Sequence, residues 1–249
     1  MKIHYKIAPG FEGLESWIKN LHGWFPDNGV SIFKDRNEVK ISEVNGLNLC
    51  VKSFKRPNLV NRLAYVYLRG SKAARSFHNA RRFLDSGAAT PAPVAYVDCL
   101  VNGQLEKSFY VTLNYPHEFT LREVLNNKTP DKENILKLWV RFTWSKLHRQ
   151  GIFHQDYSPG NTLIQKVEGG YNFAVVDLNR MKFTTVNFEL GIRNFRQLDT
   201  NEQTLRLIAT EYASLCRVSA DKAIALLLRY DQKNKDFRKR KGNLKKIFK

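Results

Sequence analysis

The chain of 249 residues is long enough to bury one sizeable core or two small ones, and its 43% hydrophobic and 26% charged composition is that of a folded protein. No apolar run approaches the roughly 18 residues of a membrane-spanning helix, and Met1–Pro9 shows no signal-peptide pattern. The three cysteines are widely spaced, which argues against a disulfide framework or a zinc site. The net charge of +18 favours a polyanionic partner: nucleic acid, an anionic membrane or a phosphorylated glycolipid.

The first part of the chain predicts a small sheet with one helix. Strands are expected at residues 30–33, 39–41, 47–54, 94–97 and 109–113. Asn45-Gly46 is a strong hairpin turn signal between two of them. Residues 71–84 have helical apolar spacing, which Gly87 ends. Asn114-Tyr115-Pro116 breaks the last strand and leads into a mainly helical part.

The second part of the chain predicts helices around a short hairpin. Residues 135–148 have helical spacing, with Thr129 as the expected N-cap, Pro130 in the first turn and Gly151 at the end. Two strands are expected at 162–164 and 173–176. Two more helices are expected, at 200–215 and after Ser219.

The most informative stretch is the loop His154-Gln155-Asp156-Tyr157-Ser158-Pro159-Gly160-Asn161, after which an apolar strand ends at Asp177. This spacing is that of a kinase catalytic loop and its metal-binding aspartate. In that chemistry one carboxylate orients the attacking hydroxyl and accepts its proton. An amide oxygen and a second carboxylate hold Mg²⁺ against the nucleotide phosphates. Asp156, Asn161 and Asp177 are the candidates for these three roles, in that order.

These motifs resemble the bacterial lipopolysaccharide kinase family, which includes the Kdo and core heptose kinases and belongs to the protein-kinase-like superfamily. The resemblance is carried by Val51-Lys52-Ser53-Phe54, residues 87–93, the loop 154–161, and Val176-Asp177-Leu178-Asn179-Arg180. Ser-Pro-Gly before the loop asparagine and Asp-Leu-Asn at the strand end are closer to this family than to ordinary protein kinases. The resemblance implies an α+β, bilobal protein-kinase-like fold: a β-rich N-lobe with one helix (1–115) and a mainly helical C-lobe (116–249).

The resemblance also implies an activity and a set of ligands. Lys52 is expected to hold the α- and β-phosphates of ATP, Asn114 and Tyr115 to form the hinge that meets the adenine, and His154 to support the catalytic backbone. The expected enzyme is an ATP- and Mg²⁺-dependent kinase for a sugar hydroxyl of the lipopolysaccharide inner core, either Kdo or heptose. A lipid-linked acceptor implies a cytoplasmic protein bound peripherally at the inner membrane.

The sequence departs from the usual kinase pattern at two points. No G-x-G-x-x-G precedes Lys52, so phosphate cover is expected from the turn at residues 34–37. Residues 70–89 contain no Glu to pair with Lys52. An anionic partner is therefore expected from outside the helix 71–84, either Glu12 or Glu15 in the N-terminal segment or Asp177 itself. If no acid fills this place, the pair is absent.

The end of the chain is strongly basic. Residues 229–249 hold seven Lys and three Arg against two Asp, a net charge of +8, with Leu244, Ile247 and Phe248 interleaved. This composition suits docking on an anionic membrane surface, and a disordered, solvated tail is the alternative. No aromatic platform or zinc pattern for RNA is present, so nucleic acid is not expected as a partner.

Two other functions stay open at this stage. One is a Rio-like or other protein kinase, although no A-P-E motif follows Asp177. The other is a nucleotide-binding pseudokinase, because the helix that usually supplies the glutamate has none. The sequence predicts no oligomeric state.

Overall fold

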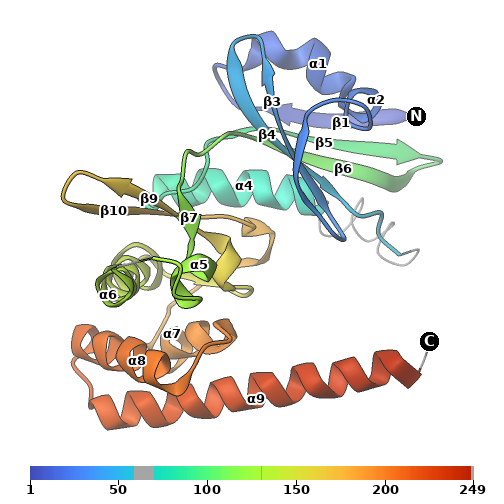
Figure 1. Ribbon diagram of the computed structural model, residues 1–249. Coiled ribbons are helices and arrows are strands. Elements are labelled where there is room, and N and C mark those ends of the chain that lie inside the picture. Colours follow the sequence, from blue (N-terminus) through green and yellow to red (C-terminus); the bar gives the residue numbers. More distant parts are fainter. Residues whose placement is uncertain (59–69, 130, 248–249) are drawn as a thin grey trace. The chain divides into compact units, whose positions relative to one another are not determined.

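Figure 1 shows the computed structural model, which describes residues 1–58, 70–129 and 131–247, with side chains as far as Asn243 in the last helix. Pro130 and Phe248, both named in the sequence analysis, lie outside the described residues. The chain forms two compact units. The N-terminal unit comprises Met1–Pro116 and Asp177–Arg180, and the C-terminal unit comprises His117–Val176 and Met181–Lys249.

The N-terminal unit is built on an antiparallel sheet of six strands in the order β1-β5-β6-β4-β3-β2. These are β1 (Lys2–Ile7), β2 (Val30–Lys34), β3 (Glu38–Val44), β4 (Leu47–Phe54), β5 (Pro93–Val101) and β6 (Gln104–Leu113). The hairpin predicted at Asn45-Gly46 is confirmed, because both residues take the positive φ angles of a tight turn, 51° and 75°. The sequence analysis did not anticipate β1, which pairs with β5 along its whole length.

The two faces of this sheet are covered by different helices (Figure 1). One face packs against two short helices, α1 (Glu15–Lys19) and α2 (Leu21–Trp24). The fully buried core residues there include Ile18, Leu21, Val51, Val97 and Phe109. We call this the outer face of the sheet.

The longer helix α4 (Lys72–Asp85) packs on the opposite face, where Phe77 meets Tyr96 with ring centroids 5.5 Å apart. The helix predicted at 71–84 is thereby confirmed. Its N-cap is Ser71, whose hydroxyl accepts a hydrogen bond from the Ala74 backbone N–H. Gly87 follows its end with φ of 75°.

The C-terminal unit is mainly helical. Its strands are β7 (Phe119–Thr120), β8 (Ile152–His154), β9 (Thr162–Val167), β10 (Gly170–Val175) and β11 (Met181–Phe183). They form two small sheets, β10-β9-β7 and β11-β8. Its helices are α5 (Leu121–Leu125), α6 (Lys132–Phe142), α7 (Phe188–Asn194), α8 (Glu202–Cys216) and α9 (Ala220–Ile247).

The predicted helix at 135–148 exists, but the prediction of its start is wrong. Helix α6 begins at Lys132, and Asp131, not Thr129, occupies the N-cap position. The Thr129 hydroxyl is buried without a hydrogen-bond partner among the described residues, so it cannot cap the free N–H groups. A π-helical turn at Thr143–Leu147 continues the helix toward Gly151, whose φ of 68° ends it.

The basic tail is helical, so the alternative of a disordered tail is wrong as far as Ile247. The first part of α9 packs on α8 and α7 and buries Ala223 and Leu227 fully. Beyond Asp231 the described side chains are almost all exposed, and Phe237 is 63% exposed. No described helix is both long and apolar enough to cross a membrane.

The fold contains one carboxyl group whose ionisation opposes folding. Burial raises the pKa of Asp98 in β5 from an ordinary 3.8 to about 6, although a hydrogen bond with the Ser71 side chain counteracts the shift. Because the folded pKa lies above the unfolded one, the contribution of Asp98 to stability is complete below pH 4 and is lost as the pH rises through about 6. Ionisation of this carboxyl group therefore destabilises the protein at neutral pH.

We predict that Asp98→Asn raises the melting temperature at pH 7.5, because the amide stays neutral and its oxygen can still accept from Ser71. The expected gain is about 1–3 kcal/mol at pH 7.5 and close to zero at pH 4. Thermal unfolding followed by circular dichroism across this range measures it. Asp27→Asn, at an exposed site, is the matched control. A gain that is equal at both pH values would contradict the assignment.

Candidate active site

Lys52 in β4 forms an ion pair with Asp177, with 2.8 Å between Nζ and Oδ1. Both side chains are partly buried, 21% and 24% exposed, although 125 residues separate them in the chain. The prediction that Lys52 meets an acid outside the helix 71–84, or Asp177 itself, is confirmed. Glu12 and Glu15 have other partners: Glu12 accepts a hydrogen bond from the Gly10 N–H, and Glu15 forms an ion pair with Lys19.

Asp177 sits in a backbone conformation that few residue types tolerate. Its φ is +62°, in the left-handed region, where a short polar side chain such as Asp or Asn is favoured. The Asn179 side chain donates a hydrogen bond of 2.5 Å to Asp177 Oδ1. The turn therefore places the carboxylate beside Lys52, and its Oδ1 accepts from both Lys52 and Asn179.

Helix α4 supports this turn without a glutamate. Asn79 Nδ2 donates to the Leu178 carbonyl at 2.7 Å, and Arg75 Nε donates to the Asn179 carbonyl at 3.2 Å. His78, at the position where the usual glutamate was sought, is exposed and lies beside the rings of Phe77 and Tyr96. The helix thus holds the backbone next to Asp177 rather than the lysine.

Positive charge gathers around Asp177. Burial lowers the pKa of Lys72, at the first turn of α4, and the charges of Arg180, Arg75 and Lys52 lower it further, whereas Asp177 opposes them. Burial is the main cause of this shift, and three cations and one carboxylate act on Lys72 in addition. The sequence analysis missed Lys72. Its place just after the capping Ser71, at a helix N-terminus that attracts anions, was the available signal.

An exposed apolar surface shares the sheet face of Lys52. Strand register places Val39 opposite Lys52, and Phe33 opposite Val39, so the three lie on one face. Val30 lies opposite Ile41 on that same face. Phe33 is 56% exposed and Val30 is 71% exposed, which is unusual for large apolar side chains of a sheet. This surface can cover a flat, partly apolar ring beside the lysine.

The segment expected to form the hinge follows β6 directly. The Asn114 backbone N–H donates to the Asn48 carbonyl at 2.8 Å, so it is already engaged. Asn114 and Tyr115 are both partly buried. Their role toward adenine stays a prediction, and any donor in this segment must be a group other than the Asn114 N–H.

The catalytic-loop residues lie in the C-terminal unit, where His154 ties the loop to the adjoining strand end. The His154 Nδ1 accepts from the Asp156 backbone N–H at 3.1 Å, and its Nε2 lies 3.2 Å from the Val176 carbonyl. Because a carbonyl can only accept, the proton is assigned to Nε2. The fully buried His154 thus holds the loop backbone, as the resemblance implied.

Asn161 closes the same loop. The Asn161 Nδ2 donates to the Asp156 carbonyl at 2.8 Å, and the backbone carbonyl of Asn161 accepts from the Val176 N–H at 2.9 Å. This orientation leaves the side-chain Oδ1 of Asn161 as an acceptor. Amide and carboxylate oxygens are the ligands that Mg²⁺ prefers, so the donor types of Asn161 and Asp177 both fit that ion.

A buried hydrogen-bond chain supports the loop from behind. Tyr212 Oη lies 2.8 Å from His148 Nδ1, and His148 Nε2 lies 3.0 Å from Asn194 Oδ1. Asn194 Nδ2 then donates to the His154 carbonyl at 2.7 Å. Burial lowers the pKa of His148 to about 4, so the chain stays neutral at physiological pH. Sequence reasoning could not find it, because His148 and Asn194 carry no motif.

Arg196 is a second residue that the sequence analysis missed. Burial and the charge of Arg193 lower the pKa of Arg196, and the nearby carboxylate of Asp156 opposes them. Asp156 is thus partly buried beside a guanidinium group. Gln197, the next residue, donates to the Gln155 carbonyl at 3.1 Å, which fixes this segment against the catalytic loop.

Comparison with solved structures shows a kinase-like fold. The chain is similar to the structure "WaaP in complex with acyl carrier protein", with 16% identity, a TM-score of 0.61, and coverage of 94% of this chain and 98% of that one. It is also similar to the Rio2 kinase-ADP/Mg²⁺-phosphoaspartate complex from Chaetomium thermophilum, with 15% identity, a TM-score of 0.50, and coverage of 92% and 74%. At these identities the likeness concerns the fold alone. No curated protein sequence matches the chain.

Residues 37–218 match the model of the lipopolysaccharide kinase (Kdo/WaaP) family. The chain belongs to this family, and it is a kinase. The resemblance stated from the sequence and the kinase-like α+β fold are thereby confirmed.

We predict that Gly191→Ala disrupts the buried chain behind the catalytic loop. An added Cβ would lie 1.8 Å from Tyr212 Oη and 3.0 Å from His148 Nδ1, so the tyrosine must move and its hydrogen bond must break. The expected loss is about 2–4 kcal/mol, from overpacking and a lost buried hydrogen bond. Chemical denaturation measures it, and Gly13→Ala, where nothing lies within 4 Å, is the control. Equal stability of both variants would refute the packing argument.

Proposed function

We propose that this protein uses ATP and Mg²⁺ to phosphorylate a sugar hydroxyl of the lipopolysaccharide inner core, either Kdo or heptose. The observation that carries the proposal is the Lys52–Asp177 pair at 2.8 Å with Lys72 beside it, because a single carboxylate acts on these two ammonium groups. A nucleoside triphosphate supplies the negative charge that this group of cations lacks. The apolar surface of Val30 and Phe33 on the same sheet face suits the base and ribose.

The residues then divide the reaction among them. Asp156 accepts the proton of the attacking sugar hydroxyl, and the backbone bonds of His154 and Asn161 keep its loop in place. Asn161 and Asp177 supply oxygen ligands to Mg²⁺, which neutralises charge on the transferring phosphoryl group when bound. Lys52 and Lys72 bind the nucleotide phosphates, and Asn114 and Tyr115 form the hinge at the adenine.

The missing glutamate does not by itself favour a pseudokinase. In the usual arrangement a helix glutamate orients the strand lysine. Here Asp177 orients Lys52, and α4 orients the turn that carries Asp177 through Asn79 and Arg75. The lysine is therefore positioned by a different route that uses the same helix.

We predict that Asp156→Asn and Asp177→Asn fail at different steps. Asp156→Asn should bind ATP normally and lose at least about a hundredfold in transfer rate, the usual scale for a general base. Asp177→Asn should lose Mg²⁺-dependent turnover, while the fold survives, because Asn also tolerates the left-handed backbone. Label transfer from ATP to a lipid-linked inner-core acceptor, compared with a protein acceptor, measures both.

Asp27→Asn serves as the control for that experiment, because its side chain is exposed. Undiminished transfer in either site variant would remove that residue from the proposed mechanism. Label appearing on protein and not on glycolipid would favour the Rio-like alternative. Mass spectrometry of the glycolipid from cells with and without the protein would identify the sugar and the hydroxyl.

The exposed part of α9 is proposed to dock the enzyme on an anionic membrane, which carries its lipid-linked acceptor. Its basic side chains are exposed together with Phe237, which suits a helix lying at a charged interface. The solved WaaP structure contains acyl carrier protein. The test must therefore distinguish membrane binding by this helix from binding to a protein partner.

We predict that a deletion of residues 237–249 weakens binding to anionic vesicles. High salt should weaken the binding of the full chain in the same way, because salt screens charges that lie more than roughly 8 Å apart. Asp231, 5% exposed and paired with Lys235 at 2.7 Å, remains in the truncated chain, so the packed part of α9 is kept. Turnover of a soluble sugar acceptor should be nearly unchanged. Vesicle co-sedimentation measures the effect.

A four-charge control distinguishes the helix from general basicity. Neutralising four lysines elsewhere on the C-terminal unit to Gln should leave vesicle binding nearly intact; all four are exposed, namely Lys128, Lys146, Lys166 and Lys182. Neutralising four basic residues of α9 should reproduce the deletion, namely Arg238, Lys239, Arg240 and Lys241. An equal loss of vesicle binding in both variants would mean that the general positive charge of the protein, and not α9 in particular, attracts the membrane.

A further inference from the structure

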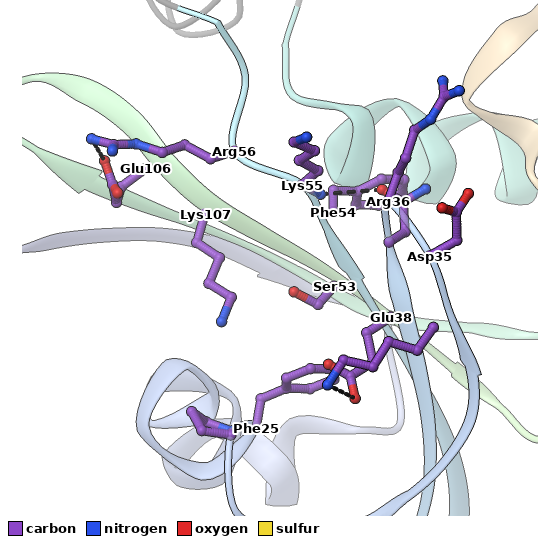
Figure 2. A pocket seen from close by; sticks show the side chains of 13 residues that line it. Phe25, Asp35, Arg36, Glu38, Ser53, Phe54, Lys55, Arg56, Glu106 and Lys107 are labelled. Atoms are coloured by element: carbon purple, nitrogen blue, oxygen red, sulfur yellow. Dashed lines mark hydrogen bonds and ion pairs between the residues drawn. The ribbon is translucent and has the colours of Figure 1, made fainter. Parts of the chain in front are cut away.

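The N-terminal unit has a pocket beside the end of β4. This pocket, of about 530 Å³, lies between the β2–β3 hairpin, the end of β4, the start of β6 and the residues after α2 (Figure 2). Lys52 and Ser53 are consecutive in β4, so their side chains point to opposite faces of the sheet. Ser53 lines this pocket from the face opposite Lys52, whereas Phe54, which also lines it, has its ring centre 5.2 Å from Lys52 Nζ.

Two ammonium groups near the Phe25 ring have no carboxylate partner among the described residues, and one of them, that of Lys107, lines the pocket. Lys107 Nζ lies 5.5 Å from the centre of the Phe25 ring and 5.3 Å from that of Phe109. Lys40 Nζ lies 4.8 Å from the same Phe25 ring. Lys40 is buried and gives its three N–H groups to the carbonyls of Phe25, Pro26 and Asn28. It therefore adds charge but offers no further donor.

Carboxylates at the rim are engaged elsewhere. Glu38 pairs with Lys34 at 3.7 Å, and Glu106 pairs with Arg56 at 2.5 Å. Figure 2 shows Asp35 at the tip of the hairpin, away from Lys107. Two cations that share one aromatic ring without a counter-ion repel each other, so an anion near Lys107 would be stabilised by both.

Hydrogen-bond donors and apolar walls complete the site. The buried Ser53 carries a hydroxyl that faces the pocket, and Lys55 stands exposed at its rim (Figure 2). Phe25 and Phe54 supply apolar wall. A phosphate monoester carries a charge of about −1.5 to −2, which matches two uncompensated ammonium groups, and its oxygens accept from ammonium and hydroxyl donors.

We propose that this pocket binds the phosphate group of a larger polar molecule, with Lys107 and Ser53 as its direct contacts. These two contacts lie on the face of the sheet opposite Lys52, although the 34–37 turn and Phe54 at the pocket's edge are close to the proposed nucleotide site. The volume exceeds that of a phosphate alone and leaves room for a sugar or glycerol unit against the phenylalanine rings. The phosphate belongs either to a soluble monoester or to a lipid headgroup.

Calorimetric titration with glycerol 3-phosphate tests the proposal. Lys107→Met removes the charge but keeps a stem that packs on the Phe25 and Phe109 rings, so the fold should persist. Loss of a charge-assisted contact predicts roughly ten- to hundredfold weaker binding in this variant. Ser53→Ala should weaken binding several-fold. Lys2→Met, which removes one exposed charge from the same unit, should bind as the unaltered protein does.

Two further experiments test where the phosphate binds and which kind of molecule carries it. Lys52→Met should leave glycerol 3-phosphate binding unchanged, which separates this pocket from the nucleotide site. Co-sedimentation with phosphatidylcholine vesicles containing phosphatidic acid distinguishes the sources: a loss in Lys107→Met assigns a lipid headgroup, and no loss assigns a soluble monoester. If glycerol 3-phosphate does not bind, or if Lys52→Met alone abolishes its binding, the proposal is overturned, even when kinase activity is normal.

Discussion

The ion pair between Lys52 and Asp177 is the constraint on which the arrangement of the N-terminal unit depends. A partly buried lysine needs an anionic partner, and removing one member of such a pair leaves an uncompensated charge. The chain satisfies this need by bringing Asp177–Arg180 into the N-terminal unit from far along the sequence. The left-handed backbone of Asp177 is the local cost of that arrangement, and the Asn179 hydrogen bond offsets part of it.

Helix α4 follows from the same constraint. Because Asp177 already partners Lys52, the helix does not need a glutamate, and its polar residues can hold the 177–180 turn instead. Near this turn Lys72 is partly desolvated, which lowers its pKa, and it feels three cations and the Asp177 carboxylate. The absence of a glutamate from α4 and the presence of cations around Asp177 both favour a highly charged anion as ligand.

Sequence reasoning reached the elements whose signal is local. The hairpin at Asn45-Gly46, the helix capped by Ser71 and the loop from His154 to Asn161 carry their own turn, cap and motif residues. It did not reach features that depend on tertiary packing. The choice between Glu15 and Asp177 as the partner of Lys52 required the fold, as did the buried chain through His148 and Asn194. Strand β1 was missed although Lys2–Ile7 alternates polar and apolar residues, which is the pattern of a half-buried strand.

The distribution of charge connects the proposed sites. A net charge of +18 destabilises a compact protein through self-repulsion, and the repulsion is greatest where cations lack counter-ions. The structure gathers cations around Asp177, beside Phe25 and along the exposed part of α9. An anion bound at any of these places relieves repulsion in the folded state but not in the unfolded chain, so binding and stability are linked. The proposed nucleotide, phosphate ester and membrane ligands would each neutralise part of the excess charge.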